Sequence, residues 1–234
     1  MATRRRSGVR HIWLRRIAWF VVIVFALLLL VIIAYRFINP PFTPVMLAEK
    51  LKGTMLQRHW VPLEAISPSL PLAVIASEDG RFCKHWGVDW GAVKDAIVEA
   101  RKRGEFRGAS TIPMQTAKNL FLWPRRSYVR KVLEVPLAYL TSLVWPKRRM
   151  MEIYLNVAEW GPGIFGAEAE SQYYFHKSAA RLSRTEASLL AGALPSPRTR
   201  NPATPGPRLS RIAHGVERRM PVIATRADCV VPRD

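Results

Sequence analysis

Residues 70–89 read LPLAVIASEDGRFCKHWGVD, an apolar run that passes almost directly into the acidic pair Glu78 and Asp79. A carboxylate beside apolar surface loses hydration, which raises its pKa and suits it to accept a proton from a sugar hydroxyl. The alternative is a solvent-exposed acid at the end of a helix, which is the commoner interpretation of an isolated Glu-Asp pair. An aromatic residue, a histidine and a glycine follow at short offsets and favour a functional site: Phe82, His85 and Gly87.

Downstream of this stretch the apolar residues mostly recur every three or four positions, in 88–100 and in 129–144, which predicts helices. Neither a sustained two-residue alternation nor an Asn-Gly hairpin signal interrupts them. Residues 183–186 read SRTE, a capping-box pattern that predicts a helix over about 184–194. A last basic helix is expected over about 208–220, after a proline-rich loop. The domain is therefore expected to be mainly α.

The N-terminal region predicts a membrane anchor. Residues 17–34 read IAWFVVIVFALLLLVIIA, which as a helix spans ~27 Å, about the thickness of a bilayer's hydrocarbon core. A cleaved signal peptide is the competing interpretation, but its apolar region is usually shorter and ends at a small-residue cleavage site. Six arginines and no acidic residue precede the run, so the N-terminus is expected in the cytoplasm and the rest outside.

Length and charge limit the remaining choices. A chain of 234 residues, 49% of them apolar, is long enough for one membrane segment and one domain with a real core. Its net charge of +19 predicts an acidic partner, which could be nucleic acid, anionic lipid or a polyphosphate-like substrate. A domain outside the cytoplasm is not expected to bind nucleic acid, so that partner is disfavoured. The expected parts are a basic tail at 1–16, a transmembrane helix at 17–35, a linker and membrane-proximal segment at 36–57, a catalytic domain at 58–220 and a tail at 221–234.

The cysteines and histidines provide no clear signal for a disulfide or a metal site. Cys83 and Cys229 could pair in an exported domain, but their geometry is not visible in the sequence, and we expect them to remain unpaired. The five histidines form no ligand-spaced cluster, so neither a zinc site nor a haem site is predicted.

A second unusual block is GASTIPMQTAKN at 108–119. Its glycine and serine indicate a turn and a helix start, and proline is tolerated in a first helical turn. Thr111, Gln115 and Lys118 then share one helix face. Such a stripe is usually solvated, but a Ser-Thr helix start followed by a lysine also suits an anion such as a diphosphate.

A third block, SYVRKVLE at 127–134, places Arg130 and Lys131 one helical turn from Glu134. The plain interpretation is an intrahelical ion pair worth about 0.2 to 0.5 kcal/mol. The functional alternative is a group that holds a phosphate or orients a metal.

Five blocks in this order resemble a known family. They read SEDGRFCKHWGVD (77–89), GASTIPMQTAKN (108–119), RKVLE (130–134), KRRMMEIYLN (147–156) and FGAEAESQYYFHKSAARLSRTEASLLAGALPSP (165–197). The chain resembles the monofunctional biosynthetic peptidoglycan glycosyltransferases of the transglycosylase family, which are related to the glycosyltransferase domain of bifunctional penicillin-binding proteins. The resemblance implies a mainly α, lysozyme-like glycosyltransferase domain with one N-terminal transmembrane helix.

The resemblance also implies the reaction. Lipid II, a disaccharide-peptide on undecaprenyl diphosphate, is polymerised into β-1,4-linked glycan with inversion and release of the lipid diphosphate. Glu78 matches the general base, and Glu134 matches a second catalytic acid that assists the diphosphate, directly or through a divalent cation such as Mg²⁺ or Mn²⁺. No other cofactor is implied. Residues expected to bind substrate are Asp79, Phe82, His85, Ser110, Thr111, Gln115, Lys118, Arg130, Lys131 and Lys147.

The chain departs from the family pattern in the second block. Ala109, Pro113 and Met114 stand where the family usually has glycine, a small polar residue and glutamine. The missing glutamine removes one expected polar contact. No Ser-x-x-Lys occurs, so the transpeptidase site of penicillin-binding proteins is absent and cross-linking is not expected.

The expected location is the bacterial inner membrane, with a single pass and the catalytic domain in the periplasm. Expected partners are lipid II, the growing glycan strand and the membrane, with cell-wall synthesis or division proteins as candidates and no nucleic acid. Two alternatives stay open: a lysozyme-like enzyme that cleaves glycan, and a non-enzymatic scaffold of cell-wall synthesis.

Overall fold

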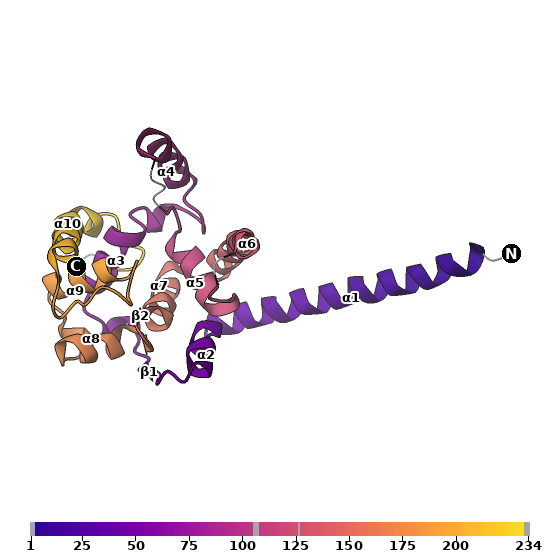
Figure 1. The fold of residues 1–234 in the computed structure, drawn as a ribbon, viewed down its shortest axis with the longest axis horizontal. Helices are drawn as coiled ribbons and strands as arrows, with labels where there is room; N and C mark the ends of the chain where they lie inside the picture. Colours follow the sequence, from indigo (N-terminus) through magenta and orange to yellow (C-terminus); the bar gives the residue numbers. More distant parts are fainter. Residues whose placement is uncertain (1–2, 105–107, 126, 232–234) are drawn as a thin grey trace. The chain divides into compact units, whose positions relative to one another are not determined.

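The computed structural model describes residues 3–104, 108–125 and 127–231, which fall into two units, 1–39 and 40–234. The first unit is the single helix α1 (Thr3–Tyr35) (Figure 1). Its stretch Ile12–Tyr35 is apolar and long enough to cross a membrane. The 24 residues span ~36 Å as a helix, more than the ~30 Å of a hydrocarbon core. This span contains the apolar run 17–34 that the sequence predicted as the membrane segment.

The second unit is mainly helical, as predicted. Its α-helices are α2 (Pro44–Leu51), α3 (Ser69–Glu78), α4 (Trp90–Arg103), α5 (Ile112–Phe121), α6 (Tyr128–Val144), α7 (Lys147–Val157), α8 (Ala167–Phe175), α9 (Arg184–Ala193) and α10 (Pro207–Ala224) (Figure 1). Among the described residues, 3-10 turns occur at η1 (Leu63–Ala65), η2 (Phe82–Lys84) and η3 (Ala179–Arg181). The predicted capping box begins α9, where the Ser183 hydroxyl accepts from the Glu186 amide and the Glu186 carboxylate accepts from the Ser183 amide.

A small sheet closes one side of this unit. Strands β1 (Gln57–Arg58), β2 (Glu159–Gly161) and β3 (Ile164–Phe165) lie in the order β1-β3-β2, with β1 parallel and β2 antiparallel to β3. The sequence does not predict this sheet, because strands of two or three residues are too short to show a two-residue period.

Helix α3 packs against α9 and α10 (Figure 1). Leu70, Ala73 and Val74 are all fully buried, and apolar residues occur on every side of the helix. A helix that is apolar all round belongs in a core, where each buried aliphatic side chain contributes about 1.5 to 3 kcal/mol. The last residue of this core helix is Glu78.

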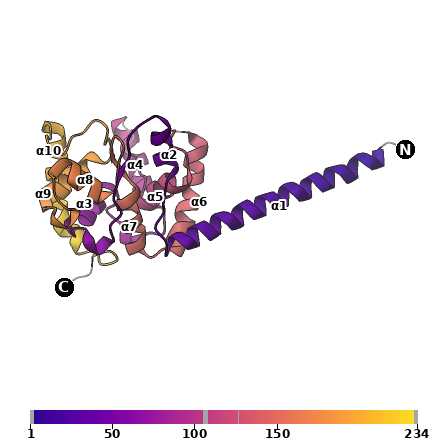
Figure 2. The same ribbon diagram turned by 90° about the horizontal axis from the view of Figure 1, so that it is seen from below.

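Helix α5 packs against both α6 and α7 (Figures 1 and 2). The side chain of Met114 on α5 is buried in a cluster with Val88 and Ala138. The residue that stands in place of the family's glutamine therefore packs in the core.

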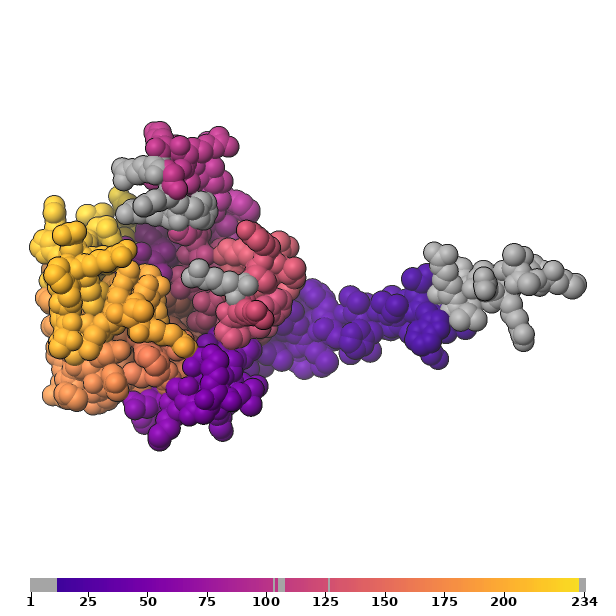
Figure 3. Space-filling view, in the orientation of Figure 1, coloured from indigo at the N-terminus to yellow at the C-terminus, as the bar shows by residue number. Residues whose placement is uncertain are grey.

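The C-terminal part is folded further than predicted. Helix α10 continues through Pro221 to Ala224, past the expected end at Met220. Beyond it Val230 is buried, and its carbonyl accepts a hydrogen bond from Arg148. The space-filling view shows the yellow C-terminal atoms forming part of one flank of the domain (Figure 3). Much of the stretch predicted as a tail is thus part of the domain.

The expectation of unpaired cysteines was wrong. Cys83 and Cys229 form a disulfide, with their Cα atoms 5.8 Å apart although they are 146 positions apart in sequence. Both cysteines are half-buried. Their proximity depends on how α10 returns to the turn η2, which no local pattern shows.

Candidate active site

Glu78 is held by hydrogen bonds at both carboxylate oxygens. Its Oε1 accepts from the Ser77 hydroxyl at 3.0 Å, and its Oε2 accepts from Gln115 Nε2 at 2.9 Å. Burial raises the pKa of Glu78; the two hydrogen bonds and Arg200 act against this, while Asp79 adds to it. The upward shift of the Glu78 pKa has the direction predicted from the apolar run, and it suits a group that accepts a proton near neutral pH.

Gln115 connects Glu78 to helix α7. The Tyr154 hydroxyl donates to Gln115 Oε1 at 3.2 Å, so the two ends of the amide bind two different side chains. Tyr154 is buried to 1% exposure. The arrangement therefore joins three elements, α3, α5 and α7, at the carboxylate of Glu78.

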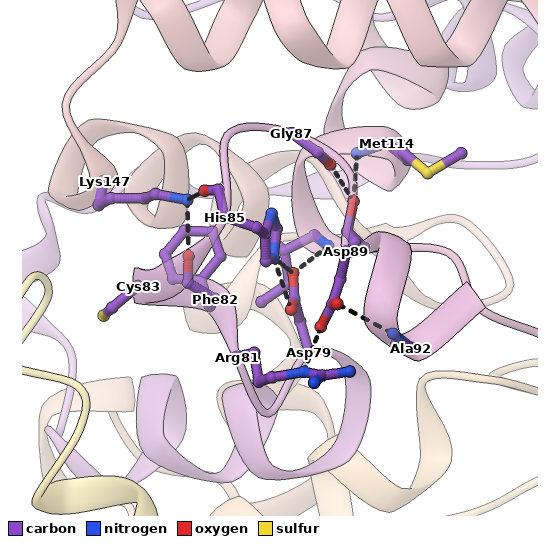
Figure 4. A network of polar contacts seen from close by, with 12 residues as sticks. Asp79, Arg81, Phe82, Cys83, His85, Gly87, Asp89, Ala92, Met114 and Lys147 are labelled. Atoms are coloured by element: carbon purple, nitrogen blue, oxygen red, sulfur yellow. Dashed lines mark hydrogen bonds and ion pairs between the residues drawn. The ribbon is translucent and has the colours of Figure 1, made fainter. Parts of the chain in front are cut away.

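The second acid of the pair, Asp79, faces the protein. Its carboxylate binds His85 Nε2 at 2.9 and 3.1 Å and accepts from the backbone amide of Ile112 at 3.0 Å (Figure 4). That amide is in the first turn of α5, where free N–H groups and the helix dipole favour an anion. Asp79 thus joins the end of α3 to the start of α5.

Three further predicted substrate contacts hold the loop that follows. Lys147 Nζ donates to the carbonyl of Phe82 at 2.6 Å and to that of His85 at 2.7 Å, and lies 4.4 Å from the centre of the Phe82 ring (Figure 4). Burial lowers the pKa of Lys147 to about 8, and Asp79 acts in the opposite direction. Phe82 is fully buried. The contacts of Phe82, His85 and Lys147 are those of groups that shape the loop.

The same loop lies tightly against α6. Gly87 has a φ of +101°, and a Cβ at this position would be 2.8 Å from the backbone carbonyl of Ala138. Thr111 donates to the Gly87 carbonyl and also caps α5 by accepting from the Met114 amide. Thr111, predicted as a substrate contact on the helix face, is therefore the N-cap of the helix.

Glu134 lies among cations on α6. Arg130 Nη1 is 2.6 Å from its Oε1 and Lys131 Nζ is 2.8 Å from its Oε2. Lys131 also donates to the Ser110 hydroxyl at 2.7 Å, which ties the loop before α5 to α6. The structure thus brings together Ser110, Arg130, Lys131 and Glu134, four of the predicted site residues.

This donor set does not fit a protein-held divalent cation. Both carboxylate oxygens of Glu134 are engaged by positive side chains. Among the described residues, no three His, Cys, Asp or Glu side chains come together in a way that could hold a metal ion. The divalent cation allowed by the resemblance stays a prediction.

Lys118 lines a cavity of about 380 Å³. The cavity lies between α5, the start of β2 and the loop after α9, and its lining includes Gln115, Tyr154, Glu159 and Arg198. Burial is the main cause that lowers the pKa of Lys118; Arg130 and Lys131 add to it, and Glu134 and Glu159 oppose it. A second cavity of about 340 Å³ is lined by Glu78 together with Asp89, Asp95 and Glu99. Glu78 thus lines one cavity, and its hydrogen-bond partner Gln115 lines the other.

Comparison with known proteins identifies the family. The family model named transglycosylase matches residues 46–226, more than half of the chain. The chain belongs to the transglycosylase family. This confirms the resemblance and the enzyme class, a glycosyltransferase.

The sequences of curated relatives are similar to that of this transglycosylase over most of their length. Proteins named biosynthetic peptidoglycan transglycosylase are similar to it: one from Rhodospirillum centenum at 48% identity over 90% of this chain and 91% of the relative, and one from Agrobacterium fabrum at 52% over 87% and 90%. A third, from Rhizobium leguminosarum bv. trifolii, is 50% identical over 84% of this chain and 88% of the relative.

Sequence reasoning missed three polar residues of the transglycosylase site: Ser77, Tyr154 and Arg198. Ser77 and Tyr154 lie inside the quoted blocks, but a hydroxyl there carries no signal of its own. Arg198 binds Glu49 at 2.6 Å and Glu159 at 2.8 Å beside the Lys118 cavity. It stands in a proline-rich loop, where nothing in the sequence marks a functional arginine.

Proposed function

We propose that this transglycosylase polymerises lipid II into β-1,4-linked glycan strands with inversion, and that Glu78 is the general base. The observation that carries the proposal is the position of Glu78, a half-buried carboxylate at the end of a core helix that lines one cavity while Gln115 lines the other. A base of raised pKa beside a cationic cavity is what transfer of a sugar from a diphosphate requires.

The 4-hydroxyl of the acceptor sugar gives its proton to Glu78 while its oxygen attacks the anomeric carbon of the donor. The bond from that carbon to the diphosphate oxygen breaks on the opposite face, and the lipid diphosphate leaves with the electron pair. One glycosidic bond forms, one glycosyl phosphate bond breaks, and the configuration inverts.

Ser77 lets Glu78 exist in either protonation state. Its hydroxyl is 3.0 Å from Glu78 Oε1 and 3.1 Å from the carbonyl oxygen of Ala191, but it has one proton to donate. Toward ionised Glu78 the hydroxyl donates. Once Oε1 carries the proton, Ser77 can donate to Ala191 and accept from Glu78. The hydrogen bond from Gln115 to Oε2 makes Oε1 the oxygen that takes the proton.

The cations of α5 and α6 are the groups suited to the leaving diphosphate. Lys118 lines the cavity beside Gln115, and Arg130 and Lys131 act on its pKa, so the three positive charges lie within electrostatic reach of one another. Fixed cations aimed at developing negative charge lower the barrier. Glu134 holds Arg130 and Lys131 in place through its two carboxylate oxygens.

The setting of the enzyme follows from the same features. We place the arginine-rich N-terminus in the cytoplasm, α1 across the bacterial inner membrane and the second unit in the periplasm. The Cys83–Cys229 disulfide supports this side, because disulfides persist in oxidising compartments. A lipid-linked substrate requires an enzyme held at the membrane surface. Cell-wall synthesis or division proteins remain candidate partners.

The test uses the full chain in detergent with labelled lipid II and separates products by size. The wild type is expected to make long lysozyme-sensitive glycan, and Glu78→Gln is expected to make none. Glu217→Gln, a half-buried acid on α10 that lines neither cavity, is the matched control and should polymerise normally. Polymer from Glu78→Gln at the wild-type rate would refute the base, and release of soluble sugar from finished glycan would indicate hydrolysis instead.

A further inference from the structure

The amide of Gln115 has two chemically different ends, and each has its own partner. Nε2 donates to Glu78 Oε2 at 2.9 Å, and Oε1 accepts from the Tyr154 hydroxyl at 3.2 Å. We propose that Tyr154 is a positioning residue for the transfer reaction, whose hydroxyl fixes the Gln115 amide with its NH₂ end toward Glu78. The inference rests on the proposed role of Glu78 as the base.

Without Tyr154 the orientation of the amide depends on the protonation of Glu78. An ionised carboxylate can only accept hydrogen bonds, so it prefers Nε2. A protonated carboxyl can donate, so it stabilises the flipped amide, with Gln115 Oε1 toward Glu78. The hydroxyl of Tyr154 donates to Gln115 Oε1 and so disfavours the flipped orientation, which favours the ionised form of Glu78.

Tyr154 is built to remain a donor. It is buried on α7, and burial raises its pKa well above the ordinary value, with Glu78, Asp79 and Glu170 adding to the effect. The phenol therefore stays neutral and keeps its proton over the whole range in which a carboxyl base operates. Its rigid ring also costs little to hold, because a buried tyrosine has few rotamers to lose.

The groups that face Glu78 from neighbouring elements remain in place when Tyr154 loses its hydroxyl. Asp79 on the same turn raises the pKa of Glu78; Ser77 and Arg200, the latter in the loop after α9, lower it. The hydrogen bond from Gln115 also lowers it. Removing the Tyr154 hydroxyl weakens that one contribution, so the pKa of Glu78 should rise.

The test measures kcat/KM for lipid II polymerisation against pH in the wild type, Tyr154→Phe, Gln115→Met and the double variant. Tyr154→Phe is expected to move the acidic limb up by about one pH unit, a tenfold loss of rate on that limb. Gln115→Met should move it by at least as much. The double variant should match Gln115→Met, because Tyr154 acts through the amide. Tyr173→Phe, on the exposed face of α8, is the matched control and should leave the profile unchanged.

Two results would overturn the role of Tyr154. One is an acidic limb that stays where it is in Tyr154→Phe, including the case in which the rate falls equally at all pH values, since that marks a structural effect. The other is a further shift when Tyr154→Phe is added to Gln115→Met. Urea unfolding of each variant shows whether it is folded, and so distinguishes misfolding from both of these results. If the wild type makes no polymer, or Glu78→Gln still makes it, the proposed function itself fails; if polymerisation requires Glu78 and the limb does not move, only the positioning role fails.

Discussion

Removing the disulfide tests how the C-terminal segment contributes to the fold. The change is the double variant Cys83→Ser, Cys229→Ser, which keeps the size of both side chains. The cysteines are 146 positions apart, and closing a loop of that length removes about 17 cal/mol/K of entropy from the unfolded chain. At 25 °C this amounts to about 5 kcal/mol, the upper end for a native disulfide. In a domain of this size the expected fall in Tm is about 10 to 20 °C.

The native geometry near the active site should survive the change. Lys147 holds the carbonyls of Phe82 and His85 on either side of Cys83, and Arg148 holds the carbonyl of Val230 next to Cys229. These contacts come from the start of α7 and do not depend on the sulfur atoms. Polymerisation at 25 °C should therefore stay within about twofold of the wild type, while the free energy of unfolding falls, because a disulfide acts mainly on the unfolded state.

The assay is urea unfolding of the full chain in detergent, followed by tryptophan fluorescence, with and without reductant. The control is thiol titration in denaturant without reductant, which should find no free thiol in the wild type. Reductant should lower the urea midpoint of the wild type to that of the double variant and leave the variant unchanged. Equal midpoints for the oxidised wild type and the variant, or two free thiols in the wild type, would refute the reasoning.

Three further predictions concern the core and the site. Leu70→Ala should lower the free energy of unfolding by about 2 to 5 kcal/mol in urea titrations, because it opens a cavity where α3 packs against α9 and α10. Glu78→Gln should be more stable than the wild type at pH 7 but not at pH 4: an acid whose folded pKa is raised binds more protons when folded, so its stability contribution is lost as pH rises above the unfolded value of 4.5. Equal stability differences at both pH values would contradict this. Lys118→Ala should lower kcat/KM about 10- to 100-fold, chiefly through weaker donor binding, whereas Lys102→Ala on the exposed side of α4 should have no effect in the same assay.

Local patterns predicted the parts of the molecule that depend on neighbouring residues. The apolar run before residue 35 is enough for a membrane helix, because length and composition alone decide whether a helix can cross a bilayer. The capping box at Ser183 and the ion pairs of Glu134 lie within one helical turn. The raised pKa of Glu78 was also readable, since the apolar run that precedes it is the helix that buries it.

The sequence by itself determined the helical class, the membrane span, the basic character and the blocks that mark the family. The tertiary structure alone decided which side chains of those blocks face the cavities. In the folded chain Asp79 binds His85, Lys147 binds the carbonyl of Phe82, and Met114 packs in the core. The tertiary structure also joined Gln115 to Glu78 across 37 positions, Tyr154 to Gln115 across 39 and the two cysteines across 146. Periodicity reports a residue's own helix face, whereas these contacts depend on how separate helices pack, and packing is a property of the whole chain.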